Sequence, residues 1–299
     1  MKKMHWPSIL LYMSSSFMIV IFNKIVLTVF AFTSVPFIMF CQSIFTSGVF
    51  LIRRDPIQRP GKDILLVCAL NVANIFFGIS SASALNVAMF TALRRISIFM
   101  TMVAQYYFLN HPVRRPVFWS VVVMITGSLI AAANDLTFDA LGYTYITLNN
   151  ALTVGAQIQT KKVLSSDWTK TTVLFWSSIL TMLVSGLQLI HFHPSSFDAW
   201  DQPAFQLAFI FSMVLGFFIN YGATWTVEEN DALTLAVAGS TKSAIMGLVV
   251  CAGLFDRTYI FTWWNFIGLQ TSAFGSLLYV YFAKRPPSSE PPKPQMPPV

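Results

Sequence analysis

The stretch NVAMFTALRRISIFMTMVAQYYFL, residues 86–109, decides the class of this protein. It is apolar and long enough to cross a bilayer, which takes about 20 residues of helix, yet Arg94 and Arg95 lie near its middle. Comparable apolar runs recur along the 299 residues, of which 55% are hydrophobic and 10% charged, whereas soluble domains carry about 25% charged residues. The sequence therefore predicts an all-α membrane protein.

Apolar windows predict ten transmembrane helices in a single domain over residues 1–285. The expected helices cover 6–30, 36–52, 64–84, 86–109, 116–133, 141–163, 171–190, 203–227, 233–254 and 262–282. The remaining residues, 286–299, are rich in proline and predict a disordered tail. Because the number of helices is even, both termini are expected on the same side of the membrane.

The distribution of Lys and Arg predicts which side that is. Most of these residues fall in the links on the side of the N-terminus, and Arg257 lies alone in a link on the other side. Cytosolic loops of membrane proteins carry the excess of Lys and Arg, so both termini and the tail are predicted to be cytosolic. The formal net charge of +7 then reflects membrane topology and not a nucleic-acid-binding surface.

A faint internal repeat predicts how the ten helices are organised. Gly127-Ser128-Leu129 recurs as Gly275-Ser276-Leu277, and the same interval separates Arg94 from Lys242. Two halves of five helices each, about 1–138 and 139–285, must be inverted relative to each other because five is an odd number. Secondary transporters are often built this way, with a binding site near the midplane where the repeats meet.

Four basic side chains remain inside the predicted helices: Lys24, Arg94, Arg95 and Lys242. Each such charge costs about 2.5–3.5 kcal/mol on the insertion scale, and no acidic residue lies deep enough in a predicted helix to pair with it. A water-filled cavity is expected to hydrate these cations, and an anionic ligand can neutralise them. Lys24 is nearer a helix end and can instead snorkel. Whether both arginines contact the ligand, or one bonds helix-end carbonyls, stays open.

Hydroxyl and aromatic residues near these cations are further candidates for the site. Thr91 shares a helix face with the arginines, and Thr241 adjoins Lys242. Cations and hydroxyls that face a cavity suit phosphate oxygens, and arginine adds a bidentate fork. Tyr221 is one of several aromatic residues that can stack on a base or a sugar, although most aromatic residues in such a chain face lipid or pack between helices.

Motifs typical of enzymes and metal sites are missing from the sequence. His191 and His193 have no third or fourth ligand beside them, and no nucleophile motif or phosphate-binding loop occurs in a fitting context. We therefore expect no metal, no cofactor and no enzymatic activity. The lack of an acidic residue at membrane depth also disfavours a proton-coupled pump.

Several segments resemble the nucleotide-sugar transporters, solute carrier family 35 of the drug/metabolite transporter superfamily, and in particular the UDP-sugar carriers of subfamily D. The resemblance extends to about Lys284 and rests on Asn23-Lys24, MFTALRRIS (89–97), NDLTFDALGY (134–143) and FTWWNFIGL (261–269). It implies residence in the Golgi or endoplasmic-reticulum membrane, and exchange of a cytosolic UDP-sugar for lumenal UMP. It also implies that Asn23 and Lys24 belong to the substrate site.

Two motifs depart from the pattern of that family. An aromatic-Asn motif expected on the seventh helix appears here as Phe175-Trp176-Ser177-Ser178, and a Gly-x-x-Lys-Asn motif on the ninth helix appears as Gly239-Ser240-Thr241-Lys242-Ser243. Serine replaces asparagine at both, while the phosphate-binding cations are retained. The resemblance implies substrate contacts for Ser177 and Ser178, and the particular sugar stays open.

Two other functions remain open at this point. The serine replacements leave open that the chain is a transport-incompetent relative, which acts as a membrane scaffold or trafficking factor. It can also exchange smaller phosphorylated substrates, as triose-phosphate carriers do. The expected partners are a nucleotide-sugar, a nucleoside monophosphate and membrane lipids, with no nucleic acid, and a homodimer is left open.

Overall fold

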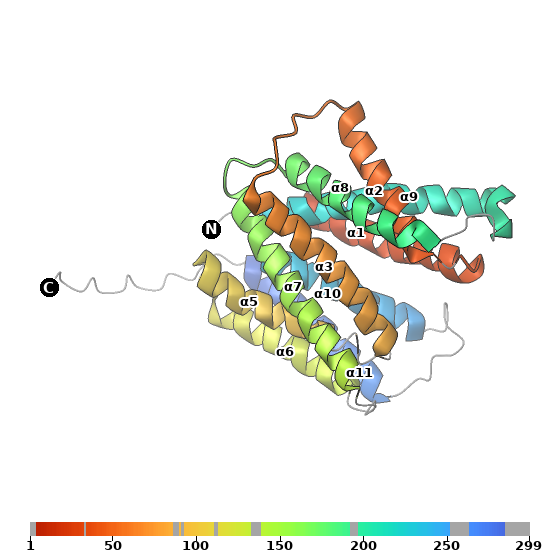
Figure 1. The fold of residues 1–299 in the computed structure, drawn as a ribbon. Helices are drawn as coiled ribbons and strands as arrows, with labels where there is room; N and C mark the ends of the chain where they lie inside the picture. The colour runs from red at the N-terminus through yellow and green to blue at the C-terminus, as the bar shows by residue number, and fades with distance from the viewer. Residues whose placement is uncertain are drawn as a thin grey trace.

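A computed structural model describes residues 4–32, 34–85, 90, 93–110, 113–132, 139–191, 197–251 and 263–284, and all regular secondary structure in these ranges is helical. The α-helices are α1 (Trp6–Lys24), α2 (Val35–Ile52), α3 (Lys62–Ala84), α5 (Ile96–Leu109), α6 (Arg115–Ala132), α7 (Ala140–Leu164), α8 (Lys170–Gln188), α9 (Pro203–Glu229), α10 (Ala232–Cys251) and α11 (Trp263–Lys284) (Figure 1). A π-helical turn, Ile25–Val29, continues α1. Two 3-10 turns, Leu189–His191 and Asp198–Asp201, lie between α8 and α9.

Local capping residues set where several helices begin. The side chain of Ser34 accepts a hydrogen bond from the amide of Phe37 at the start of α2. Asp139 does the same for two amides at the start of α7, and Thr169 for one at the start of α8. Each cap satisfies backbone donors that have no partner within the helix. These short polar residues, placed just before apolar runs, are the sequence signals that end the links.

The described helices agree with the predicted positions to within a few residues, with one exception. Among the described residues, five helices are long and apolar enough to cross a membrane: Trp6–Leu27, Val35–Ile52, Lys170–Gln188, Pro203–Glu229 and Phe266–Ala283. This fits a multi-span membrane protein. The total of ten spans stays a prediction, as do the domain limits and the tail, because residues 252–262 and 285–299 lie outside the described part of the chain.

The exception is the helix predicted over 86–109, which is divided at Arg95. Residues 93 and 94 are helical, Arg95 is in a turn, and α5 begins at Ile96. Side chains bond the backbone carbonyls on the N-terminal side of this turn: Asn150 Nδ2 donates to the carbonyl of Leu93 (2.9 Å), and Ser97 Oγ donates to that of Arg94 (2.6 Å). Interrupted helices at membrane depth persist only where such partners satisfy the backbone. Hydropathy alone does not reveal the break.

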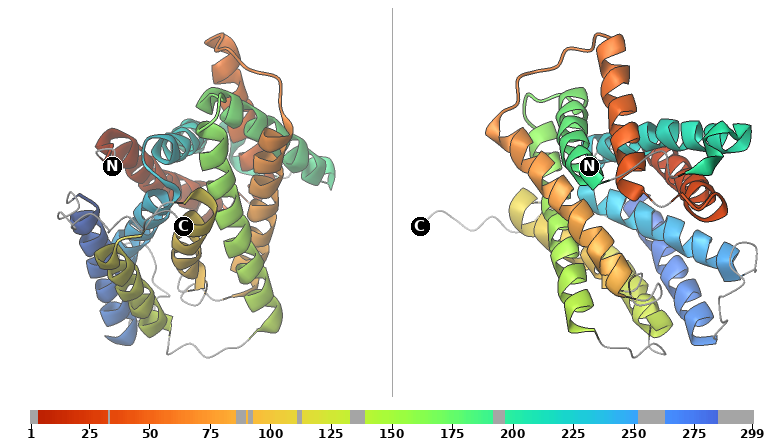
Figure 2. Two further views of the ribbon diagram at one scale, coloured as in Figure 1. Left: turned by 90° about the vertical axis from the view of Figure 1, so that its left-hand side faces the viewer. Right: turned by 45° about the vertical axis from the view of Figure 1, so that its right-hand side comes forward.

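Four helix pairs make the most extensive contacts: α6 with α11, α3 with α7, α1 with α9, and α2 with α8 (Figure 2). Each pair joins a helix of the first predicted half to a helix of the second. If each helix of the first half is exchanged with its counterpart in the second half, the pairs α6–α11 and α2–α8 stay the same. The pair α3–α7 then takes the place of α1–α9, and α1–α9 takes the place of α3–α7. Two repeats would pair in this way, and both the repeat arrangement and its inverted orientation stay predictions.

Two glycines allow α6 and α11 to approach closely. A Cβ atom on Gly127 would lie 2.5 Å from the backbone nitrogen of Ser272, and one on Gly275 would lie 2.7 Å from that of Met124. Small residues at such contacts are typical of membrane helix pairs. The two glycines belong to the repeated Gly-Ser-Leu segments, so that repeat marks a packing surface.

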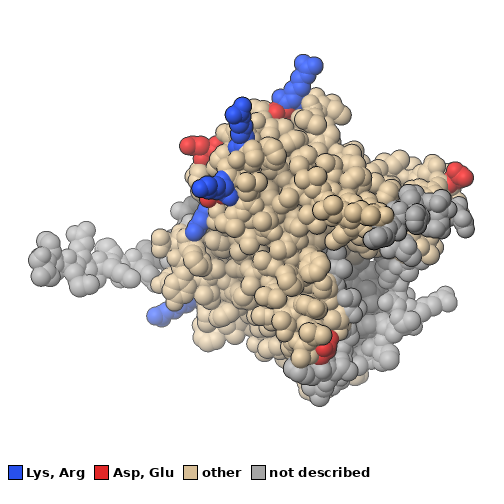
Figure 3. Space-filling model, in the orientation of Figure 1, with Lys and Arg blue, Asp and Glu red and all other residues tan. Residues whose placement is uncertain are grey.

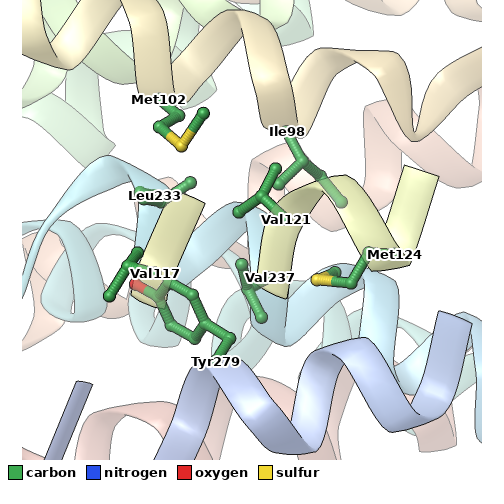
Figure 4. Close-up of a cluster of buried hydrophobic side chains, with 8 residues drawn as sticks. All are labelled: Ile98, Met102, Val117, Val121, Met124, Leu233, Val237 and Tyr279. Carbon is green, nitrogen blue, oxygen red and sulfur yellow. The ribbon is translucent and has the colours of Figure 1, made fainter. Parts of the chain in front are cut away.

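The largest buried apolar cluster lies where α5, α6, α10 and α11 meet (Figure 4). Its members are Ile98, Met102, Val117, Val121, Met124, Leu233, Val237 and Tyr279. Tyr279 also shares a hydrogen bond with Thr234 on α10, so its hydroxyl is satisfied inside the cluster. This packing fixes α5 directly after the break at Arg95, and it therefore holds the arginine pair in place.

Candidate functional site

Two adjoining cavities lie between the helices. The smaller, about 280 Å³, is lined by both arginines of the sequence motif, and we call it the arginine chamber; its lining includes Tyr12, Phe90, Arg94, Arg95 and Ser240. The larger, about 420 Å³, is lined by five carboxamide side chains, and we call it the amide chamber; these are Gln42, Asn71, Asn74, Gln157 and Asn220. Three residues, Thr153, Gln157 and Leu235, line both cavities, so the two share a wall.

Arg95 is held by one of its terminal nitrogens, and among the described residues the rest of its guanidinium has no hydrogen-bond partner. Only 4% of the residue is exposed. Its Nη1 donates to Ser128 Oγ on α6 (2.9 Å) and to Ser272 Oγ on α11. Nε and Nη2 have no hydrogen-bond partner within the described part of the chain. These are the N–H groups that form one edge of the fork with which arginine grips a phosphate.

Arg94 is the more exposed arginine and also lines the chamber. Its guanidinium carbon lies 5.6 Å from the centre of the Phe90 ring, a cation–π distance. Among the described residues that line the two chambers there is no Asp or Glu. Both arginines therefore line the cavity in which a ligand can bind. The hydroxyls that anchor Arg95 are neutral, so they do not compensate its charge.

The amide chamber combines neutral polar groups with apolar walls. Hydroxyl groups of Ser43, Thr46 and Thr181 add to its carboxamides, and Met39, Ile75 and Val173 supply apolar surface. A cavity of this kind can bind an uncharged group with polar edges and apolar faces, such as a heterocyclic base. Taken together, the two chambers can accommodate a ligand with one anionic and one neutral polar part.

Ser177 and Ser178 line the amide chamber, as the sequence suggests. Ser178 Oγ lies 2.8 Å from Ser47 Oγ on α2, and Ser177 Oγ lies 3.5 Å from Cys68 Sγ on α3. The serine pair that replaces the family's asparagine therefore contacts neighbouring helices as well as the cavity.

Three other predicted residues do not line either chamber. Asn23 Oδ1 accepts a hydrogen bond from Ser212 on α9 (2.6 Å), and Thr241 Oγ1 donates to the carbonyl of Val237 one turn earlier (3.0 Å). Tyr221 stacks on Phe217. Each of these side chains thus has a packing or hydrogen-bonding role in this conformation.

Three predicted residues cannot be placed. Thr91 lies outside the described residues. Lys24 and Lys242 lie on α1 and α10, but their side chains are outside the described part of the structure. Their contribution to the phosphate site stays a prediction.

Sequence reasoning missed Tyr12 in the arginine chamber and the carboxamides of the amide chamber. A signal for the latter was present, because amide side chains are costly in helices that cross a bilayer. Gln42, Asn74 and Asn220 all lie within predicted spans. What the sequence did not show is that their helices meet around one cavity.

A bundle of apolar helices around a cationic and polar interior defines the class of multi-span membrane transporters. The chain belongs to the triose-phosphate transporter family, which matches residues 7–280. This settles two sequence predictions: the protein is a transporter and not an enzyme.

Curated relatives cover most of the chain and confirm the resemblance to nucleotide-sugar transporters of subfamily D. The UDP-sugar transporter sqv-7 of Caenorhabditis elegans is 34% identical over 92% of this chain and 87% of its own length. UDP-sugar transporter UST74c of Drosophila melanogaster is 34% identical over 93% and 78%. Human nucleotide sugar transporter SLC35D2 is 31% identical over 92% and 85%.

A solved crystal structure also shares the fold. It aligns with a TM-score of 0.67 over 93% of this chain and 99% of the other, at 14% sequence identity. At that identity the likeness concerns the arrangement of the helices alone.

Proposed function

We propose that this chain is a nucleotide-sugar antiporter that moves a UDP-sugar into the lumen of the Golgi or endoplasmic reticulum in exchange for UMP. Relatives named as UDP-sugar transporters support the substrate class, since they align with more than nine tenths of the chain. The excess of Lys and Arg in the links beside the N-terminus supports cytosolic termini. The direction of import into the lumen is what the resemblance to nucleotide-sugar transporters implies.

The unpartnered edge of Arg95 is the observation that carries the proposal. A buried guanidinium with three N–H groups that have no partner among the described residues is expensive unless a ligand or water bonds them. The adjacent Arg94 adds a second positive charge to the same chamber. A diphosphate supplies both the negative charge and the oxygen acceptors, and the adjoining amide chamber accommodates an uncharged part of the same ligand.

One cationic chamber can serve both directions of the exchange. A nucleotide-sugar and a nucleoside monophosphate each carry roughly two negative charges near neutral pH, because the second pKa of a phosphate monoester is about 6. Without an anion, repulsion between the arginines opposes closure of the cavity. This links the conformational change to occupancy and favours exchange over one-way flow.

The amide chamber distinguishes this function from exchange of triose phosphates, a candidate that the family name itself suggests. A three-carbon phosphate needs the arginines but leaves the larger cavity empty. A scaffold without transport activity needs neither chamber to be open. Measuring which ligands the purified protein binds therefore distinguishes the proposed function from both alternatives.

The first test is thermal stabilisation of the purified full chain by UDP-sugars, UMP, other nucleotides, triose phosphate and inorganic phosphate. We expect UMP and UDP-sugars to raise the melting temperature most. Arg94→Ala and Arg95→Ala are expected to weaken binding of every phosphate ligand alike, and Arg115→Ala, an exposed arginine at the start of α6, is the matched control. If no nucleotide stabilises the protein, the carrier function is refuted.

The second test addresses exchange itself. Vesicles containing the purified protein and preloaded with UMP are expected to take up labelled UDP-sugar faster than empty vesicles. Equal uptake into empty vesicles would contradict obligatory exchange.

A further inference from the structure

The orientation of the Asn74 carboxamide is fixed by its neighbours on α7. Asn149 Nδ2 lies 2.7 Å from the backbone oxygen of Asn74 and also 2.7 Å from its side-chain Oδ1. A backbone carbonyl can only accept a hydrogen bond, so Asn149 must present its NH₂ group there. The side-chain atom of Asn74 that meets the same NH₂ group must then be the oxygen.

A second contact holds the same oxygen. Thr153 Oγ1 lies 2.7 Å from Asn74 Oδ1 and 2.8 Å from the backbone carbonyl oxygen of Asn149, and its one proton is shared between these two acceptors. Gly78, one turn farther along α3, leaves room for this arrangement, since a Cβ atom there would lie 3.0 Å from Asn149 Nδ2. With its side-chain oxygen engaged by Asn149 and Thr153, Asn74 can offer the amide chamber only its Nδ2 group. Asn74 is thus a hydrogen-bond donor of fixed polarity.

Asn220 lines the same chamber with the opposite polarity. Its Nδ2 donates to the carbonyl of Gly216 one turn earlier on α9, at 2.9 Å. The backbone carbonyl again decides the orientation: Asn220 uses one hydrogen of Nδ2 for Gly216 and keeps Oδ1 as an acceptor beside the cavity that it lines. The two asparagines therefore form a natural pair for an experiment: they are the same residue type in the same cavity, and the protein holds the side-chain oxygen of Asn74 but the side-chain nitrogen of Asn220.

We propose that Asn74 is a specificity residue that reads the base of the nucleotide by donating a hydrogen bond to the carbonyl at the 4-position of uracil. This rests on the proposed function, which supplies uridine nucleotides as ligands. Sugar hydroxyls both donate and accept, so a donor of fixed polarity distinguishes poorly among them. A pyrimidine edge has fixed polarity: the 4-position carries an accepting oxygen in uracil and a donating amino group in cytosine. The nucleoside is also the part shared by both exchanged ligands.

The test compares binding of UMP and CMP to the purified full chain by calorimetry. A matched hydrogen bond to a base edge changes the dissociation constant by about tenfold or more. We therefore expect UMP to bind at least about tenfold more tightly than CMP. Asn74→Asp keeps an oxygen for Asn149 and Thr153 but replaces the donor with an acceptor. It should reduce the UMP-to-CMP ratio by about tenfold or invert it.

Asn220→Asp is the matched control, because it adds the same negative charge to the same chamber where an oxygen is already presented. It should weaken UMP and CMP equally and leave their ratio unchanged. Asn149→Ala adds no charge and frees the Asn74 carboxamide to turn. It should also reduce the ratio, and it provides an independent measurement if Asn74→Asp does not fold.

Specific outcomes separate this inference from the function on which it rests. If UMP and UDP-sugars bind but the ratio is the same in Asn74→Asp and in the unchanged protein, Asn74 does not read the base and only the inference fails. If Asn74→Asp alters discrimination between UDP-sugars and not between UMP and CMP, Asn74 contacts the sugar and the inference is again wrong. If the unchanged protein binds none of these ligands, the proposed function itself fails.

Discussion

Arg95 reaches the arginine chamber with one nitrogen already bonded to Ser128 and Ser272, which lie on different helices. The sequence predicted the arginine but not its anchors, since the repeat that contains Ser128 does not point to Arg95 and Ser272 lies outside that repeat. The two hydroxyls fix the rotation of the guanidinium. Because they use only Nη1, they determine which edge faces the ligand.

Replacing both anchors, in the variant Ser128→Ala with Ser272→Ala, tests this positioning role. Hydrogen bonds to charged groups contribute about 1.5–3 kcal/mol, so we expect binding of UMP and inorganic pyrophosphate to weaken about tenfold or more. The UMP-to-CMP ratio should not change, because the phosphate and not the base is affected. Titration calorimetry on the purified protein measures both quantities.

Ser276→Ala is the control for that experiment. Ser276 is buried on the same helix, and its described hydrogen bond goes to the carbonyl of Ser272 within α11. Equal loss of phosphate affinity in the control would mean that disturbance of α11, and not the orientation of Arg95, causes the effect. Threonine at 128 and 272 retains the hydroxyls and should restore part of the affinity.

Among the elements, the α6–α11 pair depends on the lack of side chains at Gly127 and Gly275. The atoms that a Cβ on Gly127 would meet at 2.5 and 2.7 Å belong to the backbone of α11, which cannot move aside as a flexible side chain does. The helices must therefore separate to admit even a methyl group. Separation also pulls apart Ser128 and Ser272, so packing and the phosphate site are linked.

Gly127→Ala is expected to lower the stability of the protein by about 1–3 kcal/mol, which is the usual cost of overpacking. Gly48 on α2 provides the comparison, because a Cβ there meets nothing within 4 Å. Gly48→Ala should be neutral or raise stability by up to about 1 kcal/mol, since alanine favours the helix. Thermal unfolding in detergent measures the difference, and similar melting temperatures for the two variants would contradict the close packing of α6 and α11.

For the whole molecule, the distribution of basic residues bears on the predicted orientation in the membrane. Lys and Arg side chains gather toward one end of the face seen in Figure 3, on the side where the N-terminus lies in Figure 1. At this end, Lys161 in the last turn of α7 donates from Nζ to three backbone carbonyls at the C-terminal end of α9, and Lys170 pairs with Glu228 at 2.8 Å. The basic residues thus tie helix ends together as well as favouring a cytosolic location.

Labelling of engineered cysteines tests this orientation. Ser166 is exposed between α7 and α8, and Asp201 is exposed just before α9, at the opposite ends of these helices. In sealed microsomes with the cytosolic face outward, Ser166→Cys should react with a membrane-impermeant maleimide. Asp201→Cys should react only after permeabilisation. The reverse pattern would overturn the predicted topology.

Much of the fold could be predicted from the sequence, because apolar length and capping residues are local properties. Hydropathy located nearly every described helix but treated 86–109 as continuous, since the break at Arg95 depends on Asn150, which lies on another helix. In the candidate site, the arginines and Ser177 were found through charge and resemblance. Asn74 and Asn220 were not, because whether an amide faces a cavity is decided by how distant helices pack.

The arginine chamber has a further consequence for a compartment that becomes acidic. Among the described residues lining the two chambers, the only ionisable side chains are Tyr12, Arg94 and Arg95, and none of these residue types changes its protonation near neutral pH. A monophosphate does, because its second pKa is about 6, whereas the diphosphate of a nucleotide-sugar has no such proton to gain. Under the exchange proposed above, acidification would therefore weaken the electrostatic attraction for the monophosphate and leave that for the nucleotide-sugar unchanged.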